Sequence, residues 1–259
     1  MVTQITDSAK SLDVLFSPAE FSALAGRDLS ATTCVVFDVL RATSSMVTAL
    51  DNGAAAIVPV SEIGEALAWR ARAPEVLLAG ERDGLRIGSA LTGGAEFDLG
   101  NSPREFTAER VRAKTIVMTT TNGTRALRSC AHARRIYVGA LLNLGTLAAI
   151  MRETQPDQLL LVCSGTHEEA SYEDTLGAGA LCEELWPMYQ HGHVSDSAQI
   201  ARQIFLRERG DLASAMRRSR NGRRLLSIPE LAADVPYCMQ VGVISLVPRL
   251  QANGRVTAG

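Results

Sequence analysis

Short apolar runs alternate along the chain with longer segments in which apolar residues recur at helical spacing. The clearest run, residues 34–38 (CVVFD), is apolar up to its final aspartate, which is typical of a strand covered on both faces. Similar runs occupy residues 12–16, 54–60, 76–79, 116–118, 135–138 and 158–162. This repeated strand–loop–helix order predicts a three-layer α/β fold with a mostly parallel sheet, either as one unit or as two α/β lobes sharing a cleft.

The last third of the chain has a different pattern. Residues 195–227 predict a helical C-terminal segment with an arginine-rich face, and residues 238–240 and 243–247 predict two last short strands. No linker of low complexity divides the chain. The expected organisation is therefore a single domain over residues 12–250, with loose termini at 1–11 and 251–259.

Composition narrows the classes of protein. At 259 residues and 46% hydrophobic residues the chain can bury a large core, and its net charge of -2 gives no reason to bind nucleic acid or an anionic membrane. No apolar run approaches the ~20 residues that a membrane helix needs. The five cysteines are odd in number and include no CxxC pair, which favours free thiols in a reducing cytoplasm. We expect a cytoplasmic protein, with a homodimer as the default assembly.

Polar residues follow the predicted strands at their carboxyl ends. Because ligands of open α/β sheets bind at that edge, we expect these residues to share a cleft. They are Asp38, Glu81, the stretch 119–122, Asn143 and Ser164. The glycine-rich stretch 84–108, which contains Asn101, is expected to be an irregular active-site loop.

The stretch TTTNGTRAL (119–127) places a glycine turn between a buried strand and a helix start. Threonine hydroxyls and free N–H groups at a helix start can hold an anion, although a capped helix start without a ligand has the same pattern. The residues concerned are Thr121, Asn122, Gly123, Thr124 and Arg125.

Several of these residues have a simpler interpretation. Asp38 and Arg41 could pair locally, and Glu81, Arg82 and Asp83 could form a solvated turn. Glu173 and Asp174 are favoured at any helix N-terminus, but they could also reach a metal ion. His191 and His193 fit an exposed loop better than a metal site, and the arginines at 217, 218, 220, 223 and 224 fit a solvated helix face better than an RNA-binding surface.

Known phosphate-binding motifs are missing: the sequence has no GxxxxGK[ST], no GxGxxG after a strand and no GxSxG. What remains is a set of carboxylates with arginines and strand-end N–H groups. Mg²⁺ suits such oxygen ligands, and phosphoryl transfer requires mainly positioning and electrostatic stabilisation.

Motifs in the same order resemble the family of 2-phosphosulfolactate phosphatases over nearly the whole chain. They are DVLRATSS (38–45), GERDG (80–84), FDLGNSP (97–103), TTTNGTRAL (119–127), GALLN (139–143) and CSGT with SYEDTLGAGA (163–180). The resemblance implies an α/β fold and Mg²⁺-dependent release of sulfolactate and phosphate, a step of coenzyme M biosynthesis in methanogens. It also implies a site lined by Asp38, Arg41, Glu81, Asn101, Asn122, Gly123, Thr124, Ser164, Glu173 and Asp174.

One position departs from the family pattern. The family carries a histidine before the glycine of SxHGR, whereas this chain has Asn221 in Ser219–Gly222. Asparagine replaces a hydrogen bond of histidine but does not act as an acid or base near neutral pH. Two alternatives therefore remain. The protein is a phosphatase of the same mechanism with another substrate, or a non-catalytic binder of anions or sulfonates.

The residues divide into three predicted roles. Catalysis is assigned to Asp38, Glu81 and Ser164, and metal binding to Asp38, Glu173 and Asp174. Substrate binding is assigned to Arg41, Thr43, Arg82, Asn101, Thr121, Asn122, Gly123, Thr124, Arg125 and Asn143. Attack by water and formation of an acyl phosphate on Asp38 both remain open.

Overall fold

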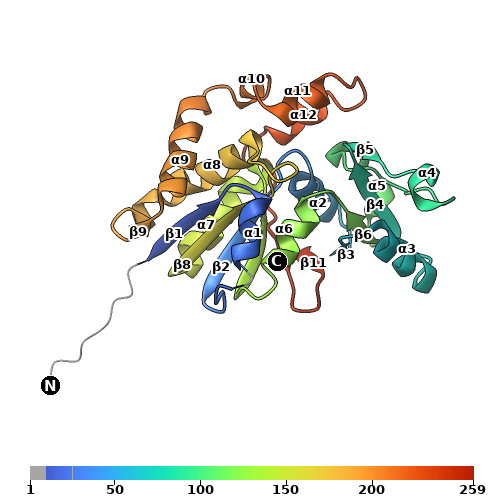
Figure 1. Ribbon diagram of the computed structural model, residues 1–259, viewed down its shortest axis with the longest axis horizontal. Helices are drawn as coiled ribbons and strands as arrows, with labels where there is room; N and C mark the ends of the chain where they lie inside the picture. Colours follow the sequence, from blue (N-terminus) through green and yellow to red (C-terminus); the bar gives the residue numbers. More distant parts are fainter. Residues whose placement is uncertain (1–9, 25) are drawn as a thin grey trace.

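Two blocks of parallel strands form the central sheet, in a computed structural model that describes residues 10–24 and 26–259 (Figure 1). The larger block has the order β7-β2-β8-β1-β9 and the smaller block the order β4-β6-β3, with parallel pairing throughout each. The strands are β1 (Ser11–Leu15), β2 (Thr32–Phe37), β3 (Ala56–Pro59), β4 (Leu77–Arg82), β6 (Thr115–Thr119), β7 (Arg135–Gly139), β8 (Gln158–Cys163) and β9 (His193–Val194). The α/β prediction with a mostly parallel sheet is confirmed.

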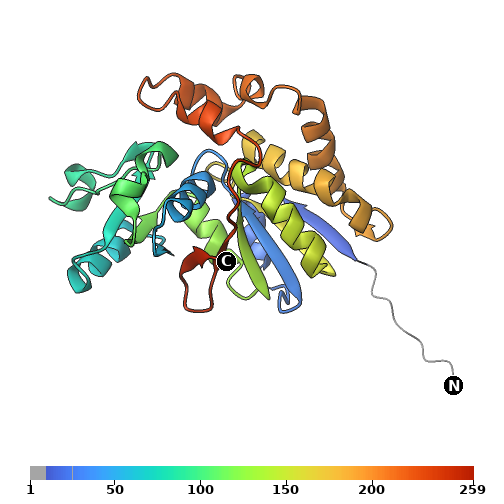
Figure 2. The same cartoon turned by 180° about the vertical axis from the view of Figure 1, so that it is seen from behind.

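A hairpin at the end of the chain joins the two blocks. Its strands, β10 (Pro248–Leu250) and β11 (Val256–Ala258), pair antiparallel with each other, β10 pairs antiparallel with β7, and β11 pairs antiparallel with β3. Three successive reversals leave the two blocks running in opposite directions. Figures 1 and 2 accordingly show them as two lobes on either side of the hairpin.

The hairpin corrects the sequence interpretation of the C-terminus. Residues 238–240 and 243–247 are not strands, because α12 (Asp234–Cys238) ends there and an irregular segment follows. Residues 251–259 are not loose, since they contain β11 and the buried side chain of Val256. At the other terminus, β1 already begins at Ser11, and residues 1–9 lie outside the described part of the chain.

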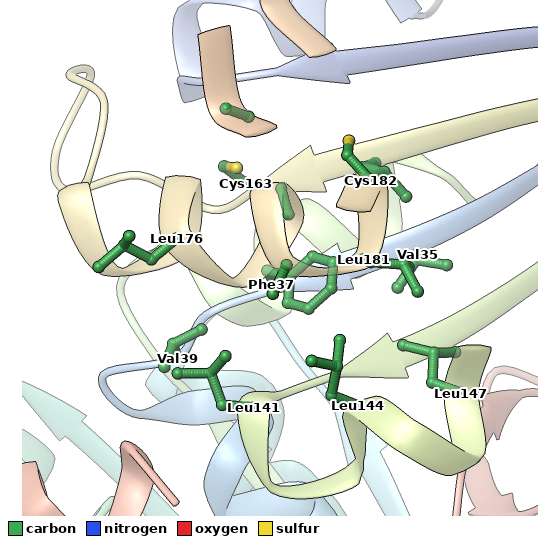
Figure 3. Packing of buried hydrophobic residues seen from close by; sticks show 14 of the residues in the cluster. Val35, Phe37, Val39, Leu141, Leu144, Leu147, Cys163, Leu176, Leu181 and Cys182 are labelled. Carbon is green, nitrogen blue, oxygen red and sulfur yellow. The ribbon is translucent and has the colours of Figure 1, made fainter. Parts of the chain in front are cut away.

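Alternating side chains of β2 build a separate core on each face of the larger block. Val35 and Phe37 pack with α7 (Leu144–Thr154) and α8 (Tyr172–Tyr189), as Figure 3 shows, whereas Cys34 and Val36 join the cluster of α2 (Ala42–Asp51) and α6 (Gly123–Ser129). Strand side chains point alternately to opposite faces, so a strand covered on both faces must be apolar at every position. This explains the uninterrupted run CVVF.

The layer of α2 and α6 also covers the smaller block. Ile57, Ile116 and Met118 from that block belong to the same buried cluster as Val36, while its other face packs against α3 (Ile63–Arg72). Both blocks therefore pack against one shared apolar layer. The remaining short elements of this part are β5 (Leu85–Arg86), α4 (Ser89–Thr92), α5 (Ala108–Val111) and α1 (Phe21–Leu24), with 3₁₀ turns at Pro18–Glu20, Pro103–Glu105 and Leu141–Asn143.

The C-terminal helices run over the junction of the two blocks, along the top of Figure 1. They are α9 (Asp196–Glu208), α10 (Leu212–Ala215), α11 (Arg220–Leu226) and α12, which confirms the helical prediction for residues 195–227. Helix α9 packs on α8 so closely that a Cβ at Gly179 would lie 2.1 Å from the carbonyl oxygen of Ala201.

All five cysteines are buried and free. Across the described residues, none of the helices combines the length and apolarity needed to span a membrane.

The close packing of α8 and α9 gives a stability test. Gly179→Ala should lower the free energy of unfolding by about 1 to 3 kcal/mol, because the added Cβ must push the two helix backbones apart. Gly64→Ala is the control: it lies in α3 with nothing within 4 Å of its added Cβ, so it should be neutral or slightly stabilising. Urea unfolding of both variants measures the difference. Equal stabilities for the two would contradict the packing.

Candidate active site

A cavity of about 90 Å³ lies where the carboxyl ends of the two blocks face each other. The larger block contributes Asp38 after β2 and Gly165 after β8, while the smaller block contributes Glu81 from β4 and Thr121 after β6. The complete lining is Asp38, Leu40, Arg41, Glu81, Asp83, Gly84, Asn101, Thr121, Asn122, Gly165, Thr166, His167, Asn221, Arg224 and Leu225. The predicted shared cleft therefore exists, but its two sides come from strands of opposite direction.

Asp38 is held by the first turn of α2. Its Oδ1 accepts a hydrogen bond from the Ala42 N–H at 3.1 Å, and its own N–H donates to Thr43 Oγ1 at 2.9 Å. On its other side, a Cβ at Gly123 would lie 2.5 Å from Asp38 Oδ2, so only glycine leaves room for the carboxylate. Thr43 and Gly123, predicted to bind substrate, thus support Asp38 instead of lining the cavity.

Burial raises the pKa of Asp38 to about 7. Repulsion from Glu81 and Glu173 acts in the same direction, whereas the Ala42 N–H and the positive charge of Arg41 oppose it. A carboxyl group that titrates near neutral pH beside a cavity is a mark of a functional site.

Glu81 ties two turns of the smaller block together. Its Oε1 accepts hydrogen bonds from the N–H and Oγ1 of Thr121 at 2.9 and 3.0 Å, and its Oε2 accepts one from the Gly84 N–H at 2.7 Å. The predicted anion cradle therefore already holds an anion, which is the Glu81 side chain. Asn122 lines the cavity and donates to the His167 carbonyl, and Thr124 is buried beneath it, bonded to Thr120.

Arg41 is buried at 3% exposure and fixed from two sides. One terminal nitrogen donates to Asp234 Oδ2 at 2.8 Å, and the other donates to the Gly84 carbonyl at 2.6 Å. Asp234 is fully buried and also accepts a hydrogen bond from Ser102 Oγ at 2.6 Å. No strand-end pattern in the sequence identifies Asp234, because it follows no strand and meets Arg41 only through the tertiary fold.

Two buried oxygen atoms have no hydrogen-bond partner in the described part of the chain. They are Asn101 Oδ1, in the cavity lining, and Ser164 Oγ, in the residue before Gly165. Buried polar atoms are nearly always satisfied, so an unpartnered acceptor in a cavity wall is available to a ligand.

The predicted acidic pair separates into two roles. Asp174 accepts hydrogen bonds from the Val39 N–H at 2.7 Å and the Gly165 N–H at 3.0 Å, so it joins the loops after β2 and β8 from behind the cavity. Glu173 accepts a hydrogen bond from Asn221 Nδ2 at 2.6 Å and lines a neighbouring cavity of about 410 Å³. Burial raises the pKa of both carboxyl groups.

Three other predicted substrate-binding residues lie outside the cavity lining. Arg82 donates to the Ser61 carbonyl and to Thr119, and Arg125 forms an exposed ion pair with Glu168. Asn143 is fully buried, where it accepts from the Ala140 N–H and donates to the carbonyls of Val138 and Leu246.

Helix α11 supplies residues that the sequence patterns did not assign to the site. Asn221 lines both cavities. Its Nδ2 donates hydrogen bonds to Thr166 Oγ1 and to Glu173 Oε1, each at 2.6 Å. Arg224 is exposed, as predicted for the arginine-rich helix face, and it also lines the smaller cavity. His191 and His193 are exposed, as predicted, although His193 lies in the short strand β9 and not in a loop.

The oxygen atoms around the cavity fit Mg²⁺ better than a metal that needs several protein ligands. No group of three or more His, Cys, Asp or Glu residues suited to a metal ion occurs within residues 10–24 and 26–259. Mg²⁺ keeps several waters and binds through only one or two carboxylates. Asp38, together with the unpartnered Asn101 Oδ1, meets that requirement.

The fold is α/β, and carboxylates and guanidinium groups meet in a cavity between the facing strand ends. The chain belongs to the 2-phosphosulpholactate phosphatase family, whose model matches residues 21–253 and confirms the resemblance seen in the motifs.

Curated relatives agree over almost their whole lengths. The chain is 37% identical over 238 residues to a protein of Caldanaerobacter subterraneus, covering 91% of this chain and 94% of the relative. It is 39% identical over 228 residues to one of Gloeobacter violaceus (87% and 91%), and 38% identical over 226 residues to one of Deinococcus radiodurans (87% and 90%). Each of the three is named a probable 2-phosphosulfolactate phosphatase.

The raised pKa of Asp38 predicts a pH-dependent cost to stability. Unfolded aspartate has a pKa of about 3.9, so between about pH 4 and 7 the native state binds more protons and the free energy of unfolding falls as the pH rises. Asp38→Asn removes this loss, and at pH 8 it should be more stable than the wild type by about 1 to 2 kcal/mol. Urea unfolding at pH 5 and pH 8 tests this. A stability difference that is the same at both values would count against the raised pKa.

The buried pair of Arg41 and Asp234 predicts strong coupling. Asp234→Ala should cost about 3 to 5 kcal/mol of stability because it leaves a buried guanidinium uncompensated, and adding Arg41→Ala should recover part of that cost. The exposed pair of Arg152 and Glu184 is the control, with an expected coupling below about 1 kcal/mol. A double-mutant cycle for each pair provides the measurement, and additive effects of Arg41 and Asp234 would refute the coupling.

Proposed function

We propose that this protein hydrolyses a small phosphate monoester, 2-phosphosulfolactate, to sulfolactate and phosphate in a Mg²⁺-dependent reaction. One observation carries the proposal: an aspartate with a pKa near 7 lies beside a fixed guanidinium in a cavity between facing strand ends. Family membership and the names of the relatives identify the reaction and substrate that this site would serve. The buried free cysteines favour a reducing compartment, and we place the protein in the cytoplasm.

The charges around the cavity support a requirement for a cation. The lining contains three carboxylates, Asp38, Glu81 and Asp83, against two guanidinium groups, Arg41 and Arg224, and the charge of Arg41 is already balanced by Asp234. A phosphate dianion would be repelled by these surroundings unless positive charge were added. Asp38 and Asn101 Oδ1 are the groups that would hold Mg²⁺. When bound, the ion would offset the negative charge that collects on the transferring phosphoryl group.

The protein side chains would supply binding and orientation. Arg41 cannot move far, because Asp234 and the Gly84 carbonyl hold it, so its remaining N–H groups form a preset site for phosphoryl oxygens. Glu81 keeps the two turns around the cavity at a fixed separation. The first turn of α2 holds the Asp38 carboxylate through the Ala42 N–H, and this carboxylate would face the phosphate end of the substrate.

Phosphate release tests the proposal. Wild-type protein with Mg²⁺ should release phosphate from 2-phosphosulfolactate faster than from other small phosphate esters, and EDTA should abolish the release. Asp38→Asn should lower kcat by about 10³-fold, the scale of losing one preorganised electrostatic group at the reacting centre. Asp51→Asn, at the exposed far end of the same helix, is the matched control and should retain full activity.

Each outcome has a defined meaning. Full activity of Asp38→Asn would remove Asp38 from the mechanism, and activity in EDTA would remove the metal. No release from any ester, combined with tight binding of sulfolactate, would show a non-catalytic binder.

A further inference from the structure

The two arginines in the cavity lining differ in their electrostatic state. Arg41 is buried and its charge is balanced by Asp234, whereas Arg224 is exposed on α11. Arg224 has no carboxylate within ion-pair distance among the residues that the structure describes. Its guanidinium therefore lines the cavity without being held in an ion pair.

Both arginines are attached to the same turn. Arg41 donates a hydrogen bond to the Gly84 carbonyl at 2.6 Å, and Arg224 donates one to the carbonyl of the preceding residue, Asp83. This turn connects β4 and β5, and both of its residues line the cavity. Since the two acceptors belong to successive peptide groups, a small molecule could reach both guanidinium groups at once.

Helix α11 holds Arg224 in a defined place. Ser219 Oγ caps the helix by accepting the Gly222 N–H at 2.8 Å, and a Cβ at Gly222 would lie 2.2 Å from the Met216 carbonyl oxygen. The backbone two residues before Arg224 is thus packed tightly against the preceding segment. A guanidinium on such a support can recognise a group of fixed geometry.

The position of Asp38 decides which end of a substrate each arginine meets. Asp38 and Arg41 lie in the same loop after β2, and the phosphorus atom must approach Asp38 for reaction. The phosphate therefore belongs beside Arg41. Arg224, on α11, lines the same cavity and would then meet the other end of the molecule.

We propose that Arg224 determines substrate specificity by binding the sulfonate group at the end of the substrate opposite the phosphate. This assignment rests on the proposed function. A planar guanidinium offers two parallel N–H donors, which match two oxygens of a sulfonate, and its charge is free for this purpose. A phosphate ester without a second anionic group would leave Arg224 unused.

Three substrates separate the sulfonate from the carboxylate. They are 2-phosphosulfolactate, 2-phospholactate, which lacks the sulfonate, and phosphorylated 2-hydroxyethanesulfonate, which lacks the carboxylate. Arg224→Gln should lower kcat/KM by about 10- to 100-fold for both sulfonates, mainly through KM, as expected for one charge-assisted hydrogen-bonded contact. The loss for 2-phospholactate should be at least about tenfold smaller.

Two further variants sharpen the comparison. Arg223→Gln is the matched control, since Arg223 directly precedes Arg224 on the helix and lines only the neighbouring cavity. Its ratio of sulfonate to phospholactate turnover should equal that of the wild type. Arg224→Lys, which keeps the charge without the forked donors, should recover part of the loss.

The results can overturn the inference in two ways. An equal loss on all three substrates, or a loss that follows the carboxylate, would refute the assignment to the sulfonate. Calorimetric binding of sulfolactate separates this inference from the proposed function. If the wild type releases no phosphate but Arg224→Gln still weakens sulfolactate binding relative to Arg223→Gln, the phosphatase proposal fails and the sulfonate site stands. If phosphate release holds and sulfolactate affinity is unchanged in Arg224→Gln, the sulfonate assignment fails alone.

Discussion

The reversal of strand direction at the C-terminal hairpin is the constraint on which the site depends. In a single parallel sheet, all carboxyl ends would lie along one edge and a ligand would contact them from one side. Here β10 and β11 join two blocks of opposite strand direction, and Glu81 and Thr121 of the smaller block line one cavity together with Asp38 and Gly165 of the larger block. The apolar layer of α2 and α6 packs against both blocks. A short hairpin near the end of the chain is therefore as important for the site as the strands that carry its side chains.

Bringing these strand ends together concentrates negative charge. Asp38, Glu173 and Asp174 all have raised pKa values, caused first by burial and, for Asp38 and Asp174, also by mutual repulsion with neighbouring acids. Burying ionised carboxylates costs free energy. Backbone N–H groups offset part of that cost, because they donate hydrogen bonds to the carboxylates of Asp174 and Glu81. The pKa of Asp38 stays raised, so its ionised carboxylate still lowers the stability of the folded protein. Active sites commonly reduce stability in this way.

The sequence predicted the elements that depend on local patterns. The run CVVF, ended by an aspartate, identified β2 and placed Asp38 at a strand end, and the same reasoning placed Glu81 and Asn122 in the cleft. It could not predict contacts that depend on the arrangement of distant segments. Arg41 and Asp234 are 193 positions apart, and the orientation of Arg224 depends on the packing of α11 over the junction. Asn143 and Arg82 follow the same strand-end pattern as Glu81, yet their hydrogen bonds are directed into the protein interior, which no periodicity reveals.

We propose that the acidic centre at Asp38, between the facing strand ends, is neutralised by a divalent cation. The most direct test of this proposal is a ¹³C NMR titration of the Asp38 carboxyl group, assigned with the Asp38→Asn protein, with and without Mg²⁺. We expect a midpoint near 7 in the metal-free protein, because burial raises the pKa of Asp38 to about 7, and a lower midpoint when Mg²⁺ is present. A midpoint near that of solvated aspartate, about 4, with no response to Mg²⁺, would contradict it.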